Sequence, residues 1–143
     1  MIQLRVVSPH AEDVVALIEQ LNAHTLTLFP PEFCYFDPPE VLARANCTML
    51  GAYEGQEICG IGAVKFFADY GEIKRMFVPP QFRSRGISKL ILKKLLSLIE
   101  QQGLAYARLE TGEKHQAAIS LYRKCGFIDC EPFGEYQKTA HNM

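Results

Sequence analysis

The sequence predicts a single mixed α+β (mixed α/β) domain that covers residues 1–143. Three strand-like runs follow one another through short turns in residues 48–78, and a helical period of apolar residues begins after Gly86. A chain of 143 residues also suits one domain with its own core. The apolar share of 48 % and the charged share of 22 % are ordinary for a globular protein and exclude wholesale disorder.

The N-terminal part predicts a strand and two helices. Leu4–Val7 is a candidate first strand, and Ser8-Pro9 is typical of the start of a helix. That helix should cover residues of about 10–22, because apolar residues recur there at helical spacing. Its stripe consists of Val14, Leu17, Ile18 and Leu21. A short second helix is expected near Glu40–Ala45, after a pair of prolines.

The middle of the chain predicts an antiparallel meander. Thr48–Tyr53, Ile58–Phe67 and Glu72–Val78 are the expected strands, and the turns between them contain Gly55 and Gly71. Two prolines follow the third strand and end it, because proline cannot donate to a strand ladder.

The last third predicts helix, strand, helix and strand. Gly103 suits the C-terminal cap of the first of these helices, whose apolar stripe is Ile87, Leu90, Ile91, Leu95, Leu98 and Ile99. Leu104–Glu110 is the next strand, and the helix after it carries Ala118, Leu121, Tyr122 and Cys125 at helical spacing. Gly126 should end this helix, and Phe127-Ile128 should begin a further strand.

Composition excludes several function classes. The net charge of −1 argues against a nucleic-acid binder, which usually has a basic excess. No signal peptide and no membrane-spanning run is evident, so we expect a cytoplasmic protein without a membrane partner. The five cysteines include no C-x-x-C pair and the histidines are scattered, so we expect reduced thiols and no metal site.

The segment Arg83–Lys89 is the most informative stretch. A strand, a turn with glycine and a helix start together form an anion site, because the first helical N–H groups lack intrahelical acceptors. Arg83, Arg85 and Lys89 add cationic donors that suit phosphate. An ordinary turn with solvated basic residues explains the pattern equally well. The segment matches neither a Walker P-loop nor a dinucleotide fingerprint.

Three segments resemble the GNAT (Gcn5-related N-acetyltransferase) superfamily. Residues 78–88 are similar to its acetyl-CoA segment, with Arg83, Gly86 and Ser88 on the pattern Q/R-x-x-G-x-G/A. Residues 72–78 are similar to the family's fourth strand, and A-I-x-L-Y-x-x-x-G-F in residues 118–127 is the sharpest match. The resemblance implies a central mixed, mostly antiparallel sheet of about 6–7 strands flanked by about four helices.

The resemblance also implies an activity. Acetyl-CoA would be the co-substrate, without a metal, and its acetyl group would pass directly to a primary amine of a small molecule or amino acid. Tyr122 matches the family tyrosine near the thioester sulfur, and a phenol can donate a proton to the departing thiolate. Glu72 is the candidate general base. Alternatively, Tyr122 is a core residue and Glu72 is an exposed strand-end carboxylate or part of a surface ion pair.

The residues that bind acetyl-CoA are carried over from the same resemblance. Main-chain groups of Met76, Phe77 and Val78 would contact the pantetheine arm. The pyrophosphate cradle would consist of Arg83, Ser84, Arg85, Gly86, Ile87, Ser88 and Lys89. Lys89 could instead be a solvated helix lysine. His115 stands where many relatives have an asparagine that touches the pantetheine arm, and it could also be a solvated first-turn residue.

The resemblance also implies that the segment of about residues 23–37 lies over the acceptor pocket. Its aromatic side chains are Phe29, Phe33, Tyr35 and Phe36, while Glu32 and Asp37 could hold a cationic amine. The aromatic residues could equally plug the edge of the core.

Other functions remain open alternatives. The chain could be a non-catalytic acyl-CoA-binding regulatory module, an acetyltransferase of a protein or peptide amine, or a binder of another phosphate ligand. A last strand at Pro132–Tyr136 would be short or missing, and an incomplete sheet edge would favour a homodimer.

Overall fold

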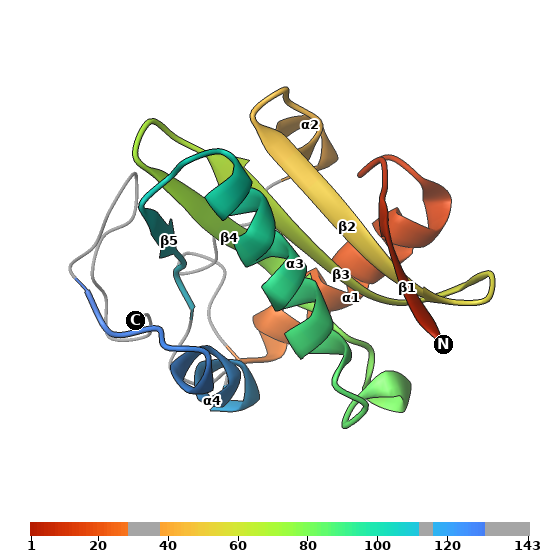
Figure 1. The fold of residues 1–143 in the computed structure, drawn as a ribbon. Helices are drawn as coiled ribbons and strands as arrows, with labels where there is room; N and C mark the ends of the chain where they lie inside the picture. Colours follow the sequence, from red (N-terminus) through yellow and green to blue (C-terminus); the bar gives the residue numbers. More distant parts are fainter. Residues whose placement is uncertain (29–37, 112–115, 131–143) are drawn as a thin grey trace.

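The computed structural model describes residues 1–28, 38–111 and 116–130, and it has the mixed α+β architecture that the sequence predicts (Figure 1). Its strands form one sheet in the order β1-β2-β3-β4-β5. In chain order the elements are β1 (Ile2–Val6), α1 (Glu12–Leu28), α2 (Pro39–Leu42), β2 (Cys47–Glu54), β3 (Glu57–Phe66), β4 (Tyr70–Phe77), a 3₁₀ turn (Pro80–Phe82), α3 (Ile87–Gln101), β5 (Tyr106–Arg108) and α4 (Gln116–Lys124).

The sheet is mixed but mostly antiparallel. β1 to β4 pair antiparallel in sequence order, whereas β5 joins the outer edge of β4 in parallel. The parallel pair requires a crossover, which α3 supplies. The described residues contain five strands, so the expectation of about 6–7 strands exceeds what this part of the chain holds.

Helices cover both faces of the sheet (Figure 1). α3 packs on one face, where Ile91, Leu92 and Leu95 are fully buried against β2 to β4. α4 adds Tyr122 to this same core. α1 and α2 contribute Val14 and Leu42 to a second core on the opposite face. We call the two faces the α3 side and the α1 side.

A close approach between β3 and α3 fixes the start of that helix. A Cβ atom built on Gly62 would lie 2.5 Å from Cγ2 of Ile91 and 2.7 Å from Sδ of Met76. Any larger side chain would therefore push α3 off the sheet. Because α3 lies so close, its N-terminus is held near the end of β4.

Several sequence-based predictions need correction, apart from small shifts at the ends of elements. α1 runs from Glu12 to Leu28, two turns beyond the predicted end, because helical backbone continues through its last threonines. On α3, Leu92 is buried and Leu90 is 43 % exposed, so the stripe is rotated from the predicted one. β5 is restricted to Tyr106–Arg108.

The fourth correction concerns Phe127-Ile128, which begin no strand within the described residues 127–130. The Phe127 N–H instead donates to the Tyr122 carbonyl at the end of α4, and Ile128 is 87 % exposed. These contacts use Phe127 as part of the helix ending. The predicted strand at Pro132–Tyr136 lies outside the described residues.

Three further findings concern the described part of the chain. None of its helices is long and apolar enough to cross a membrane. Cys47, Cys59, Cys125 and Cys130 form no disulfide there. We also find no cluster of His, Cys, Asp and Glu side chains there that could hold a metal ion.

Candidate active site

An opening in the sheet lies between β4 and β5. The two strands pair only from Tyr70 with Tyr106 to Glu72 with Arg108. β4 continues to Phe77, and on its other edge it still pairs with β3, where Phe77 is opposite Ile61. Within the described residues, strand pairing between β4 and β5 therefore ends at Glu72.

A bulge interrupts β4 inside this opening. Lys74 is opposite Ala63 and Phe77 is opposite Ile61, so Arg75 and Met76 together face Gly62 on β3. Arg75 has a φ of 56°, a left-handed conformation that is uncommon for residues other than glycine. The bulge turns Arg75 to the α1 side, where its guanidinium donates to the Ile18 carbonyl at 3.4 Å and to the Asn22 side chain.

Glu72 and Lys74 form a buried ion pair on the α1 side. Lys74 Nζ lies 3.2 Å from a carboxylate oxygen of Glu72, and the two side chains are only 7 % and 5 % exposed. Ile73 between them packs into the α3-side core, as alternation along a strand requires. The alternative that Glu72 is an exposed strand-end carboxylate is therefore wrong. It does form an ion pair, but the pair is buried and lies beside the opening.

Tyr122 is a core residue on the α3 side. Its ring meets the ring of Phe127 edge to face, with centroids 5.7 Å apart. Burial raises the pKa of the Tyr122 phenol, so the hydroxyl keeps its proton well above neutral pH. Glu72 and Tyr122 thus lie on opposite faces of the sheet, and the structure records no contact between them.

The loop before α3 has the backbone geometry of an anion cradle. Ser84 and Gly86 both have left-handed φ values, of 66° and 76°. The first α3 hydrogen bond runs from the Leu90 N–H to the Gly86 carbonyl at 3.1 Å. The N–H groups of Ile87 and Ser88 therefore have no acceptor within the helix, and the helix dipole makes this end electropositive.

The basic side chains of this loop have partners elsewhere. Arg83 Nε donates to the Val78 carbonyl at 3.0 Å, which ties the loop to the end of β4. The Arg85 guanidinium pairs with the Glu54 carboxylate in the β2–β3 hairpin. Lys89 is exposed on the first turn of α3. The cradle of this structure is therefore built mainly from backbone N–H groups, and Arg83 holds it in place.

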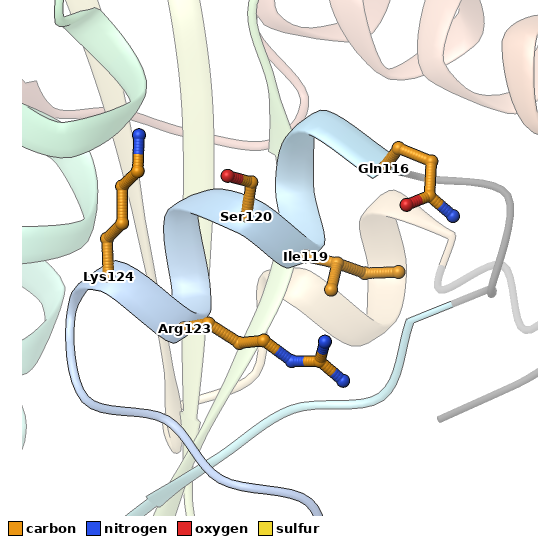
Figure 2. Close-up of a pocket in the computed structure, with 5 residues that line it drawn as sticks. All are labelled: Gln116, Ile119, Ser120, Arg123 and Lys124. Carbon is orange, nitrogen blue, oxygen red and sulfur yellow. The ribbon is translucent and has the colours of Figure 1, made fainter.

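A shallow hollow of about 420 Å³ runs along α4 (Figure 2). Its lining residues are Gln116, Ile119, Ser120, Arg123 and Lys124. Ser120 and Lys124 lie on one side of the helix and Ile119 and Arg123 on the other. Neither Glu72 nor Tyr122 lines this hollow. None of the five lining residues is a candidate site residue from the sequence. The only sequence feature that they share with a binding site is the adjacent basic pair Arg123 and Lys124.

Two groups of predicted site residues lie outside the described residues. One is His115, and the other is residues 29–37 of the acceptor segment, with its aromatic and acidic side chains. Residues 23–28 of that segment form the end of α1.

Comparison with known proteins identifies the family of this chain. The model of the Acetyltransferase (GNAT) family matches residues 16–127. The IAA acetyltransferase of Azospirillum brasilense is 37 % identical over 131 residues, which cover 90 % of this chain and 86 % of that protein. The uncharacterised N-acetyltransferase YedL of Escherichia coli (strain K12) is 35 % identical over 132 residues, covering 90 % of this chain and 83 % of that protein.

Solved structures agree on the fold. A Klebsiella pneumoniae protein assigned as an acyl-CoA N-acyltransferase superposes with a TM-score of 0.83 at 28 % identity, covering 100 % of this chain and 95 % of that one. A Clostridium acetobutylicum acetyltransferase solved with acetyl-CoA has the same fold, with a TM-score of 0.69 at 19 % identity and coverage of 96 % of each chain. The sequence match over most of its length shows that this chain belongs to the GNAT acetyltransferase family and is an acyltransferase.

Proposed function

We propose that this chain transfers an acetyl group from acetyl-CoA directly to a primary amine of a small molecule or amino acid. One observation carries the proposal: the β4–β5 opening begins at the buried Glu72, and the strand that carries Glu72 leads through the 3₁₀ turn into the backbone cradle before α3. A relative named IAA acetyltransferase supports acetyl transfer, and a structural neighbour solved with acetyl-CoA supports acetyl-CoA as the donor.

The cradle would bind the pyrophosphate of acetyl-CoA. Gly86 has open space where a side chain would begin, so a ligand can come close to the backbone there. The N–H groups of Ile87, Ser88 and Lys89 point from the helix start, and Ser84 and Arg85 complete the loop. Arg83 is best described as a positioning residue, because its Nε already donates to the Val78 carbonyl.

The pantetheine arm would lie along the open edge of β4. Met76, Phe77 and Val78 all follow the last residue that pairs with β5. Their main-chain groups on that edge can form strand-like hydrogen bonds with the amides of the arm. The thioester would then lie in the opening next to the bulge. His115 stays a proposed contact to the arm, since it lies outside the described residues.

The reaction needs one base and one acid. Glu72 would accept the proton from the attacking amine, directly or through a water molecule, on the α1 side. A C–N bond forms, the C–S bond of the thioester breaks, and Tyr122 would donate its phenolic proton to the departing thiolate on the α3 side. Burial raises the pKa of Tyr122, so the acid form is the one present at the start of each turnover.

Two measurements test the proposal. Acetyl-CoA should raise the unfolding temperature of the protein, whereas ATP, NAD and duplex DNA should not. Free CoA thiol should then appear when an acceptor amine is added. Stabilisation without CoA release from any amine would favour the non-catalytic CoA-binding module. No stabilisation by acetyl-CoA would reject both readings.

A further inference from the structure

We propose that the acceptor amine carries a carboxylate close to the reacting nitrogen, as an amino acid does, and that cations on the α1 side of β4 and β5 bind this carboxylate. The inference rests on the function proposed above and narrows its acceptor class. It starts from the charges that the sheet register collects around Glu72.

Strand pairing places several charged residues on one face. Glu72 is the partner of Lys65 on β3 and of Arg108 on β5, and paired residues on neighbouring strands share a face. Lys74 lies two residues along β4 on the same face, and the bulge brings Arg75 there as well. We call this set the acceptor face; it consists of Lys65, Glu72, Lys74, Arg75 and Arg108.

Cations outnumber carboxylates on the acceptor face. Glu110 lies two residues after the end of β5, and we count its carboxylate together with that of Glu72. Four cationic side chains then face these two carboxylates within the described residues. Helix α1, which packs on this face, has no Asp or Glu after Glu19. Excess positive charge next to a low-dielectric protein interior strengthens the local electric field, and this field attracts an anionic group.

The arrangement suits a zwitterion better than a polycation. Glu72 is a carboxylate next to the opening, with the Lys74 ammonium 3.2 Å away. The Arg108 guanidinium carbon lies 4.9 Å from the ring centroid of Tyr70 and 5.5 Å from that of Tyr106, so two aromatic rings position this guanidinium. A guanidinium fits a carboxylate in bidentate fashion. An amino acid whose amine lies at Glu72 would thus have its own carboxylate among the cations of the acceptor face. The further ammonium groups of a polyamine would instead be repelled there.

Matched acceptor pairs test the inference. We would measure kcat/KM for each of the common L-amino acids and for its carboxamide, which lacks the anionic charge, together with spermidine, and express each value per unprotonated amine because the amide has the more acidic ammonium group. Hydrogen bonds to a charged group typically change affinity by about ten- to a hundredfold, so the best amino acid should exceed its amide by at least about tenfold. Equal rates for acid and amide, or faster acetylation of the amides or spermidine, would overturn the inference and leave the proposed function intact. Absence of CoA release with every amine would overturn the proposed function and, with it, the inference.

A charge-neutral variant locates the preference. Arg108→Gln should lower the acid-to-amide ratio about fivefold or more, mainly through a higher KM for the acid. Partial misfolding would lower both rates together, so the ratio is insensitive to it. Lys93→Gln is the matched control, because it removes the same charge from the exposed side of α3. An unchanged ratio in Arg108→Gln, or an equal fall in Lys93→Gln, would overturn the assignment to the acceptor face.

Discussion

Replacement of Glu72 by glutamine separates its proposed chemical role from its structural one. The Glu72 carboxylate and the Lys74 ammonium are 3.2 Å apart, and their side chains are 5 % and 7 % exposed. Neutralising Glu72 alone leaves the Lys74 charge buried without this carboxylate. Breaking a buried pair from one side typically costs about 3–5 kcal/mol. For a domain of this size that corresponds to a fall in unfolding temperature of about 10–15 °C.

The chemical loss should be separable from the loss of stability. Removal of a general base lowers turnover by about 10²- to 10⁴-fold. Glu72→Met/Lys74→Met removes both charges while keeping similar volumes, and replacing a whole buried pair by apolar residues is often close to neutral. We therefore expect the double variant to recover most of the unfolding temperature while kcat stays at least about a hundredfold low.

The assay combines thermal unfolding followed by circular dichroism with kcat from the release of CoA thiol. Turnover is measured at saturating acceptor and well below the unfolding midpoint of each variant. A double variant that unfolds near the wild-type temperature and keeps the wild-type kcat would remove Glu72 from the chemistry. A Glu72→Gln protein with an unchanged midpoint would show that the buried pair contributes little to stability.

Three further predictions use side chains elsewhere in the molecule. Tyr122→Phe should lower kcat about a hundredfold and leave the acetyl-CoA Kd, measured by calorimetry, unchanged; full turnover would reject the proposed acid. Gly86 has a φ of 76°, so Gly86→Ala should lower the free energy of unfolding by about 1–2 kcal/mol and weaken acetyl-CoA binding. Gly103 has a φ of 73° beyond the end of α3, so Gly103→Ala should lower stability by the same amount without loss of affinity for acetyl-CoA. Burial and then the hydrogen bond to Asp13 raise the pKa of Tyr53 to about 12, so the folded state holds this proton after the unfolded chain loses it near pH 10. The free energy of unfolding should therefore fall as pH rises from 10 to 12. In Tyr53→Phe, denaturant unfolding should show a decrease that is smaller by about 2–3 kcal/mol. The same pH profile in wild type and variant would contradict the raised pKa of Tyr53.

Patterns that depend on near neighbours in the chain were predictable. The meander follows from short turns between apolar runs, and β2 (Cys47–Glu54) matches the predicted Thr48–Tyr53 within one residue at each end. Gly103 ends the α3 region as predicted, because a residue with a φ of 73° after a helix is almost always glycine. The loop before α3 was identified from Arg83 and Gly86, and its backbone geometry is that of an anion cradle.

Features that depend on tertiary contacts were not predictable. Alternating apolar and polar residues suggest a half-exposed strand, yet β4 is covered on both faces, and this buries Glu72 and Lys74. Gly60 and Gly62 on β3 let Ile91 pack close to the sheet, and Leu92 is fully buried next to it. Phe127 looked like a strand residue because it is aromatic, but its N–H completes the end of α4. In β4 and α3, packing between distant segments overrode the local preference, whereas Phe127 is held by a helix-end hydrogen bond to Tyr122.

The bulge in β4 connects the fold with the proposed chemistry. In a regular strand Met76 would share the α1 side with Lys74, and Phe77 would face α3. The extra residue reverses this order: Met76 packs on the α3 side, Phe77 joins the α1-side core, and Arg75 is turned toward α1. A left-handed non-glycine residue costs about 1–3 kcal/mol, which the guanidinium contacts with α1 offset. Bulges also bend the strand that carries them, and this one lies just after the last β4 residue that pairs with β5, while it turns Arg75 to the face that carries Glu72. We infer that the position of the bulge, rather than any one side chain, determines both which residues of β4 would contact acetyl-CoA and which charged residues lie on the acceptor face.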